Sequence, residues 1–176
     1  VRVTPLALNP KIRHLDREQA CGQVRQKFGI DGPYILTVGT RWPRRNMALA
    51  FAACDALPGD MPHRLVVAGK AGWGTETESP RALRTGYVGD DDLSALYSAA
   101  SLYLTPSMHE GFGLTILEAF ACGAPAVCGP GGALPETAGD AALVLPDYQV
   151  ATWSEAVRSL LGNSSKLEEM RERGRR

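Results

Sequence analysis

Short apolar segments alternate with helix-length segments along most of this chain, and this alternation limits the choice of fold more than any single motif. The expected strands lie at 34–39, 64–68, 85–88, 102–105, 126–128 and 142–145. The expected helices lie at 16–28, 46–57, 92–100, 113–121, 134–138, 151–161 and 165–173. Strands that alternate with helices favour an open parallel sheet covered on both faces. The sequence therefore predicts an α/β, Rossmann-like fold.

The ends of several elements carry their own signals. Asp16 is expected to cap the helix at 16–28, and Gly29 is expected to stop it. A further short strand is expected at 1–6, while the charged residues at 166–176 predict a chain end that frays. The first residue is Val rather than Met, in a strand-like stretch, which indicates a domain excised from a longer protein.

Composition excludes several classes of protein. With 44% hydrophobic residues among 176, the chain can bury one sizeable core, so residues 1–176 are expected to form a single domain. Lys and Arg together number 19, as do Asp and Glu, so no overall field attracts nucleic acid and any anion site must be local. The four cysteines are scattered without zinc-ligand spacing, which indicates reduced thiols in a cytoplasmic protein. No apolar run reaches the length of a membrane span.

The most informative motif is E-G-F-G-L-T-I-L-E at 110–118. Gly111 and Gly113 let a ligand approach the backbone, and the free N–H groups of the following helix face an anion such as a phosphate. Glu118 lies in an otherwise apolar helix, where an ionised carboxylate needs hydrogen-bond donors. The carboxylates of Glu110 and Glu118 can each accept two hydrogen bonds from a vicinal diol, so the motif predicts a nucleotide-sugar site.

Glycine and basic residues follow several of the expected strands, at the edge of the sheet where ligands bind in such folds. Gly39 and Lys70 belong to two of these loops, and Arg44 and Arg45 follow Gly39. Converging Arg and Lys side chains would stabilise a departing diphosphate. Neither a P-loop motif nor G-x-G-x-x-G occurs, so the phosphate must be held differently.

Other motifs have simpler interpretations. D-D-D at 90–92 precedes an apolar helical run, so we expect one Asp to cap that helix and the others to favour its positive end, without a metal. His109 in H-E-G lacks the second His of a zinc helix but lies close to the expected ligand. Gly131 and Gly132 either border a ligand or form a plain turn.

Three ordered segments carry a resemblance to a known family. P-S-M-H-E-G-F-G-L-T-I-L-E-A-F-A-C-G-A-P-A-V at 106–127 resembles the E-x7-E signature of the retaining glycosyltransferase family 4, which includes relatives of glycogen synthase and mannosyltransferases. V-G-T-R-W-P-R-R-N at 38–46 and G-G-A-L-P-E-T-A-G-D-A-A-L at 131–143 resemble two further segments of that family. The resemblance implies the carboxyl-terminal, donor-binding half of a GT-B fold.

The resemblance also implies roles for matching residues. Glu110 would lie beside the donor sugar, Glu118 would take the ribose hydroxyls, and main-chain N–H groups at 112–115 would hold the phosphates. The implied catalytic set is Glu110, Arg45 and Lys70, and the implied donor-binding set is Gly39, Thr40, Arg44, Gly111, Phe112, Gly113, Leu114, Thr115 and Glu118. Thr40 stands where many members carry Arg, so Arg41 or Arg44 would take its place.

The expected function is transfer of a hexose from a nucleotide diphosphate sugar to a glycan, lipid or small-molecule acceptor, with retention and without a metal or other cofactor. The P-R-R-N loop resembles members that use GDP-mannose or other hexose donors. The amino-terminal acceptor domain of the family is absent from this sequence, so the isolated domain is expected to bind the donor without transfer. Peripheral membrane association would come only through that absent domain. The alternatives are a binding module without turnover and a nucleotide-sugar epimerase.

Overall fold

The computed structural model describes residues 7–73 and 79–176, and the predicted α/β fold is confirmed. Within these residues, six strands form one parallel sheet in the order β3-β2-β1-β4-β5-β6. The strands are β1 (Tyr34–Val38), β2 (Arg64–Ala68), β3 (Ala82–Gly86), β4 (Leu102–Thr105), β5 (Ala126–Cys128) and β6 (Ala142–Val144). The helices are α1 (Arg17–Phe28), the 3-10 turn η1 (Pro43–Arg45), α2 (Met47–Asp55), α3 (Asp90–Ala99), α4 (Leu114–Ala121), α5 (Leu134–Ala138), α6 (Val150–Leu161) and α7 (Ser164–Gly174).

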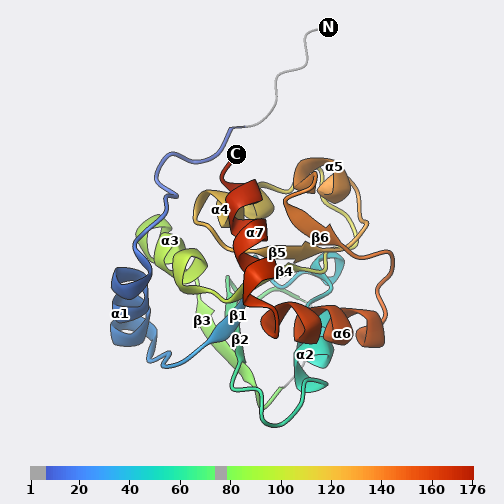
Figure 1. Ribbon diagram of the computed structural model, residues 1–176, viewed down its shortest axis with the longest axis horizontal. Helices are drawn as coiled ribbons and strands as arrows, with labels where there is room; N and C mark the ends of the chain where they lie inside the picture. Colours follow the sequence, from blue (N-terminus) through green and yellow to red (C-terminus); the bar gives the residue numbers. More distant parts are fainter. Residues whose placement is uncertain (1–6, 74–78) are drawn as a thin grey trace, which may run out of the picture.

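The sheet separates two hydrophobic cores, because successive strand residues point to opposite faces. Leu36 and Val66 are buried in the core that α1, α3 and α4 cover. Ile35 and Leu65, their neighbours in the chain, are buried in the core that α2 and α6 cover. Figure 1 shows α1 and α3 on one side of the sheet and α2 and α6 on the other. Burial on both faces explains why the central strands are apolar throughout.

The strand order reverses at β1, which pairs with β2 on one side and with β4 on the other. Ile35 of β1 therefore lies between Leu65 and Leu102. At the carboxyl ends of the strands, the chain continues from β1 to α2 on one face of the sheet and from β4 to α4 on the other face. In open α/β sheets, the crevice at such a reversal is the usual ligand site.

The two ends of α1 form as the sequence predicts. The side chain of Asp16 accepts hydrogen bonds from the main-chain N–H groups of Glu18 and Gln19. Gly29 ends the helix in the left-handed conformation, with φ of 65°.

The predicted cap of α3 is wrong. The N-cap is Gly89, and Asp90, Asp91 and Asp92 all lie in the first turn, where they favour the positive end of the helix. Asp92 instead pairs with Lys27 of α1. Its carboxylate is used to hold α1 and α3 together, so it is not available as a cap.

The strand expected at 85–88 is displaced, and β3 begins earlier. Ala82 is already paired with Leu65 of β2, so the neighbouring strand determines where β3 starts. Tyr87 lies beyond the strand and is 72% exposed. The strand expected at 1–6 lies outside the described residues.

The carboxyl-terminal charged segment forms an ordered helix, so the predicted fraying is wrong. Leu167 and Met170 of α7 are buried in the same core as Trp153 of α6. In Figure 1, α7 runs from α6 back to α4, which it contacts. One apolar stripe therefore anchors a helix whose other side chains are mostly charged.

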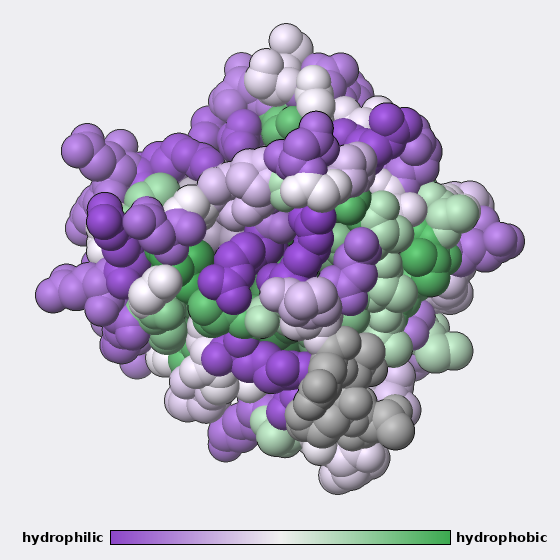
Figure 2. All heavy atoms as spheres, turned by 90° about the horizontal axis from the view of Figure 1, so that it is seen from below, coloured by the Kyte–Doolittle hydropathy of each residue, from purple (hydrophilic) through white to green (hydrophobic). Residues whose placement is uncertain are grey.

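On the face shown in Figure 2, hydrophilic residues predominate and the hydrophobic residues form separate patches. Within the described residues, no helix combines the length and the apolar character needed to cross a bilayer.

Candidate functional site

The loops after β1 and β4 are joined to each other at the crevice. The main-chain N–H of Met108 donates to the carbonyl of Arg44 over 2.8 Å. The guanidinium of Arg44 in turn donates to the carbonyl of His109 over 3.1 Å. Residues that are far apart in the sequence are thus brought together at the point where the strand order reverses.

Glu110 pairs with both arginines of η1. Its Oε2 accepts a hydrogen bond from Nη1 of Arg44 over 3.1 Å, and its Oε1 lies 2.5 Å from Nη1 of Arg45 in an ion pair. The Arg45 side chain is 15% exposed and that of Arg44 is 41% exposed, whereas Glu110 is buried. Two guanidinium groups and one carboxylate leave a net charge of +1 at this point of the crevice. Such a cluster suits a phosphate that approaches from the exposed Arg44 side.

Arg45 owes its position to the absence of a side chain at Gly39. A Cβ atom on Gly39 would lie 3.2 Å from Cζ of Arg45, so the guanidinium packs directly over the glycine. Asn46, with φ of 50°, then turns the chain into α2. The predicted loop residues Gly39, Arg44 and Arg45 are therefore in one place.

Gly113 provides the turn into α4. Its φ of 93° is a conformation that other residues rarely adopt, and no side chain of the described residues caps this end of the helix. Leu114 and Thr115 form the first turn, and the carbonyl of Phe112 accepts a hydrogen bond from Thr137. The main-chain N–H groups at the start of α4 can therefore serve an anion, as the sequence predicts for 112–115. Gly111 is exposed beside them.

Glu118 is half-buried on the next turn of α4. Burial raises the pKa of its carboxyl group, while a hydrogen bond from Tyr97 and the charge of Arg45 oppose that rise. The hydroxyl of Tyr97 donates to Oε2 of Glu118 over 3.1 Å. The sequence analysis did not identify Tyr97, although a tyrosine among the small and apolar residues of 93–100 is a signal that its hydroxyl has a buried partner.

A cavity of about 370 Å³ opens beyond the carboxyl ends of β1, β2 and β3. Its walls include the predicted residues Gly39, Thr40 and Lys70 and the side chains of Tyr87, Val88 and Leu93, which the sequence analysis did not single out. The Lys70 ammonium lies 5.0 Å from the centre of the Tyr87 ring, and no contact of Lys70 with Glu110 is present in the described part of the chain. Lys70 therefore lines this cavity with Gly39, whereas Arg45 packs over Gly39 and pairs with Glu110.

Gly131 and Gly132 are required for packing. A Cβ atom on Gly131 would lie 2.4 Å from the carbonyl oxygen of Met108, and one on Gly132 would lie 2.3 Å from that of Glu110. The two glycines allow the loop after β5 to press against the 108–110 backbone. Close approach of two main chains accounts for them without a ligand.

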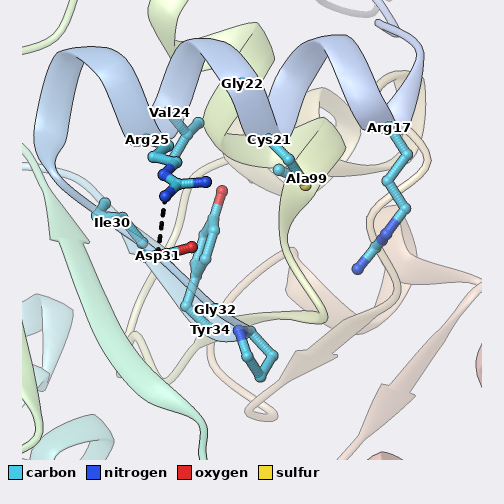
Figure 3. Close-up of a pocket in the computed structure, with 11 residues that line it drawn as sticks. Arg17, Cys21, Gly22, Val24, Arg25, Ile30, Asp31, Gly32, Tyr34 and Ala99 are labelled. Atoms are coloured by element: carbon cyan, nitrogen blue, oxygen red, sulfur yellow. Dashed lines mark ion pairs between the residues drawn. The ribbon is translucent and has the colours of Figure 1, made fainter.

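A second cavity, of about 400 Å³, lies at the opposite edge of the sheet, where β1 begins. Figure 3 shows that Tyr34 projects into it beneath α1, near the ion pair between Arg25 and Asp31. Since ligands of such sheets bind beyond the carboxyl ends of the strands, this cavity is not part of the candidate site.

No group of three or more His, Cys, Asp or Glu side chains in the described part of the chain is arranged to hold a metal ion. His109 is exposed beside Glu110, at the mouth of the crevice.

Comparison with known proteins identifies the family of this chain. The family described as glycosyl transferases group 1 matches residues 23–176. The chain belongs to this family. The O-antigen chain mannosyltransferase B of Escherichia coli is 38% identical to this chain over 168 residues, which cover 88% of the chain and 44% of the relative.

Solved structures show the same fold at lower sequence identity. WaaG, a glycosyltransferase involved in lipopolysaccharide biosynthesis, superposes with a TM-score of 0.83 at 21% identity, over 99% of this chain and 50% of that one. Anabaena Alr3699/HepE in complex with UDP and glucose superposes with a TM-score of 0.76 at 16% identity, over 93% and 48%. This glycosyl transferase domain therefore spans about half the length of these proteins and has the Rossmann-like fold of one GT-B half.

Proposed function

We propose that this chain is the donor-binding, carboxyl-terminal half of a retaining hexosyltransferase of glycosyltransferase family 4. The observation that carries the proposal is the meeting of three features at the crevice: the Glu110 pair with Arg44 and Arg45, the uncapped start of α4, and the half-buried Glu118. A nucleotide diphosphate sugar offers a matching set of groups, namely a sugar, two phosphates and a ribose diol.

Each group of the donor has a counterpart in this site. The N–H groups at the start of α4 receive the phosphates, with Arg44, Arg45 and Lys70 stabilising the charge that the diphosphate gains as it leaves. Glu118 receives the ribose hydroxyls, and Glu110 positions the transferred sugar. The base enters the cavity that Gly39 and Leu93 line. Leu93 lies one turn of α3 before Tyr97, and Tyr97 contacts Glu118, so this cavity lies near the expected ribose position.

The nature of the donor is supported by the relatives. HepE was solved in complex with UDP and glucose, which supports a nucleoside diphosphate as part of the donor, and the mannosyltransferase relative supports mannose as the sugar. The donor is the substrate itself, and no metal or further cofactor enters the scheme. The acceptor, a glycan, lipid or small molecule, is held by a second domain, so the isolated chain binds the donor with negligible transfer.

Calorimetric titration of the chain with UDP, GDP and ADP tests this function. Glu118→Ala is expected to weaken nucleoside diphosphate binding at least about tenfold, because one charge-assisted contact to the ribose is lost. Glu172→Ala, on the exposed surface of α7, is the control and should leave the affinity unchanged. Equal affinities of wild type and Glu118→Ala would refute the ribose role.

A further inference from the structure

Tyr97 connects two helices of the candidate site without reaching its surface. It is fully buried on α3, and its hydroxyl lies 3.1 Å from Oε2 of Glu118 and 3.2 Å from the carbonyl oxygen of Thr115, both on α4. Its ring packs edge-on against Tyr103, with ring centres 5.3 Å apart. A phenol held in this way has few positions available, so it determines where the carboxylate oxygen that it contacts can lie.

One proton must serve two acceptors, since a hydroxyl donates a single hydrogen bond. The ionised carboxylate of Glu118 is the stronger acceptor, so it receives the proton in preference to the Thr115 carbonyl. Among the described residues, no other side chain donates to Glu118. Removing the hydroxyl would therefore leave a half-buried carboxylate without a donor from the protein.

Several charged or titratable groups face Glu118. The other titratable groups that face it are Asp90 on α3, Arg45 in η1, Tyr103 on β4 and Cys122 at the end of α4. Burial and Asp90 disfavour the carboxylate, whereas the Tyr97 hydrogen bond and Arg45 favour it. Of the two groups that favour the carboxylate, Tyr97 is the one that makes a directional hydrogen bond to it.

We propose that Tyr97 is a positioning residue whose hydroxyl orients the Glu118 carboxylate to receive the ribose hydroxyls of a nucleoside diphosphate. The proposal rests on the function proposed above. Tyr97 does not touch the nucleotide and acts only through Glu118. It occupies one lone pair of Oε2 and leaves Oε1 and the remaining lone pair of Oε2 for the two hydroxyls.

Titration of Tyr97→Phe with GDP, UDP and ADP over a range of pH tests the proposal. Affinity at neutral pH is expected to fall about tenfold, since an oriented hydrogen bond to a charged group is lost. Loss of the hydroxyl also raises the pKa of Glu118, so the acid limb of the binding curve moves to higher pH. A residue that only supported the fold would not move that limb.

Tyr34→Phe is the matched control. Tyr34 is also buried, and its hydroxyl donates to the carbonyl of Leu96, on the same helix α3, over 2.6 Å. Tyr34 lies at the amino-terminal end of β1, away from the carboxyl ends of the strands. Removing its hydroxyl therefore costs a comparable hydrogen bond without touching Glu118. Nucleotide affinity and the acid limb should match wild type.

Wild-type affinity and an unmoved acid limb in Tyr97→Phe would overturn the positioning role. Absence of any nucleotide binding by the wild-type chain would instead count against the proposed function. If Tyr97→Phe does not fold, Tyr97→Met replaces it, because methionine also lacks the hydroxyl and leaves Glu118 itself unchanged, and the acid limb is measured in the same way. A loss of about tenfold supports the role, and unchanged affinity overturns it.

Discussion

Two arginines share one carboxylate at the crevice, but they are not equivalent. Arg45 is largely covered and packs on Gly39, whereas Arg44 is partly exposed and lies 5.3 Å from the centre of the Trp42 ring. Because of this difference in burial, Arg45 contributes more to the stability of the fold, and Arg44 is the more accessible of the two to a ligand. Arg45 compensates the buried charge of Glu110, and Arg44 remains accessible to a phosphate.

Arg45→Met and Arg44→Met should therefore differ in stability. Arg45→Met is expected to lower the free energy of unfolding by about 3 kcal/mol, because a buried carboxylate loses its covered partner. Arg44→Met should cost below about 1 kcal/mol, as for other exposed pairs. Denaturant unfolding of both variants measures the difference, and equal losses would contradict the assignment.

The raised pKa of Glu118 predicts that its contribution to the free energy of unfolding falls as pH rises, whereas that of an ion-paired acid increases. Its folded-state pKa lies above the unfolded value, so the ionised form destabilises the fold at high pH and this cost disappears as pH falls through the folded-state pKa. Glu118→Gln keeps an acceptor for Tyr97 without the charge. It should raise the melting temperature at pH 8, with a benefit that shrinks toward pH 4. A constant difference between the two pH values would argue against the raised pKa.

At the scale of elements, the neighbouring strands and helices determine the bounds and the order of those elements whose local sequence is ambiguous. β2 and β4 form at the predicted residues because a run of apolar, largely β-branched or leucine residues buried on both faces fits few other structures. β3 is partly exposed, and its start follows β2 rather than its own β-propensity. The charged helix α7 is likewise held by what it packs against.

Met170→Ala tests how firmly α7 is held. Met170 is 5% exposed in the core shared with α6. Its truncation should cost about 2–4 kcal/mol of unfolding free energy, the usual range for a buried methionine. Glu172→Ala, on the exposed side of the same helix, should cost about 0.5 kcal/mol or less. Similar small losses in both variants would mean that α7 frays after all.

At the scale of the whole molecule, the candidate site lies where the strand order reverses, and its residues come from separate loops. A ligand that contacts the loops after β1 and β4 together must stabilise the folded chain by mass action. At a concentration of one hundred times Kd, a nucleoside diphosphate should raise the melting temperature by about 5–10 °C.

A thermal-shift series with UDP, GDP and ADP, each alone and as its hexose conjugate, measures this effect and ranks the bases. Inorganic phosphate at the same concentration is the control, because it fills only the phosphate position. No shift with any nucleotide would contradict the proposed donor site.

The sequence by itself determined the α/β class and most element bounds, because apolar periodicity and glycines are local consequences of burial and backbone geometry. It also predicted that 110–118 belongs to the candidate site. Tertiary structure alone decided the pairing of Glu110 with Arg44 and Arg45 and the contact of Tyr97 with Glu118. It also decided that Asp92 binds Lys27 instead of capping α3 and that Gly131 and Gly132 serve packing. These outcomes depend on which loops and helices the parallel sheet brings together. The spacing of residues along the sequence does not give their distances in space.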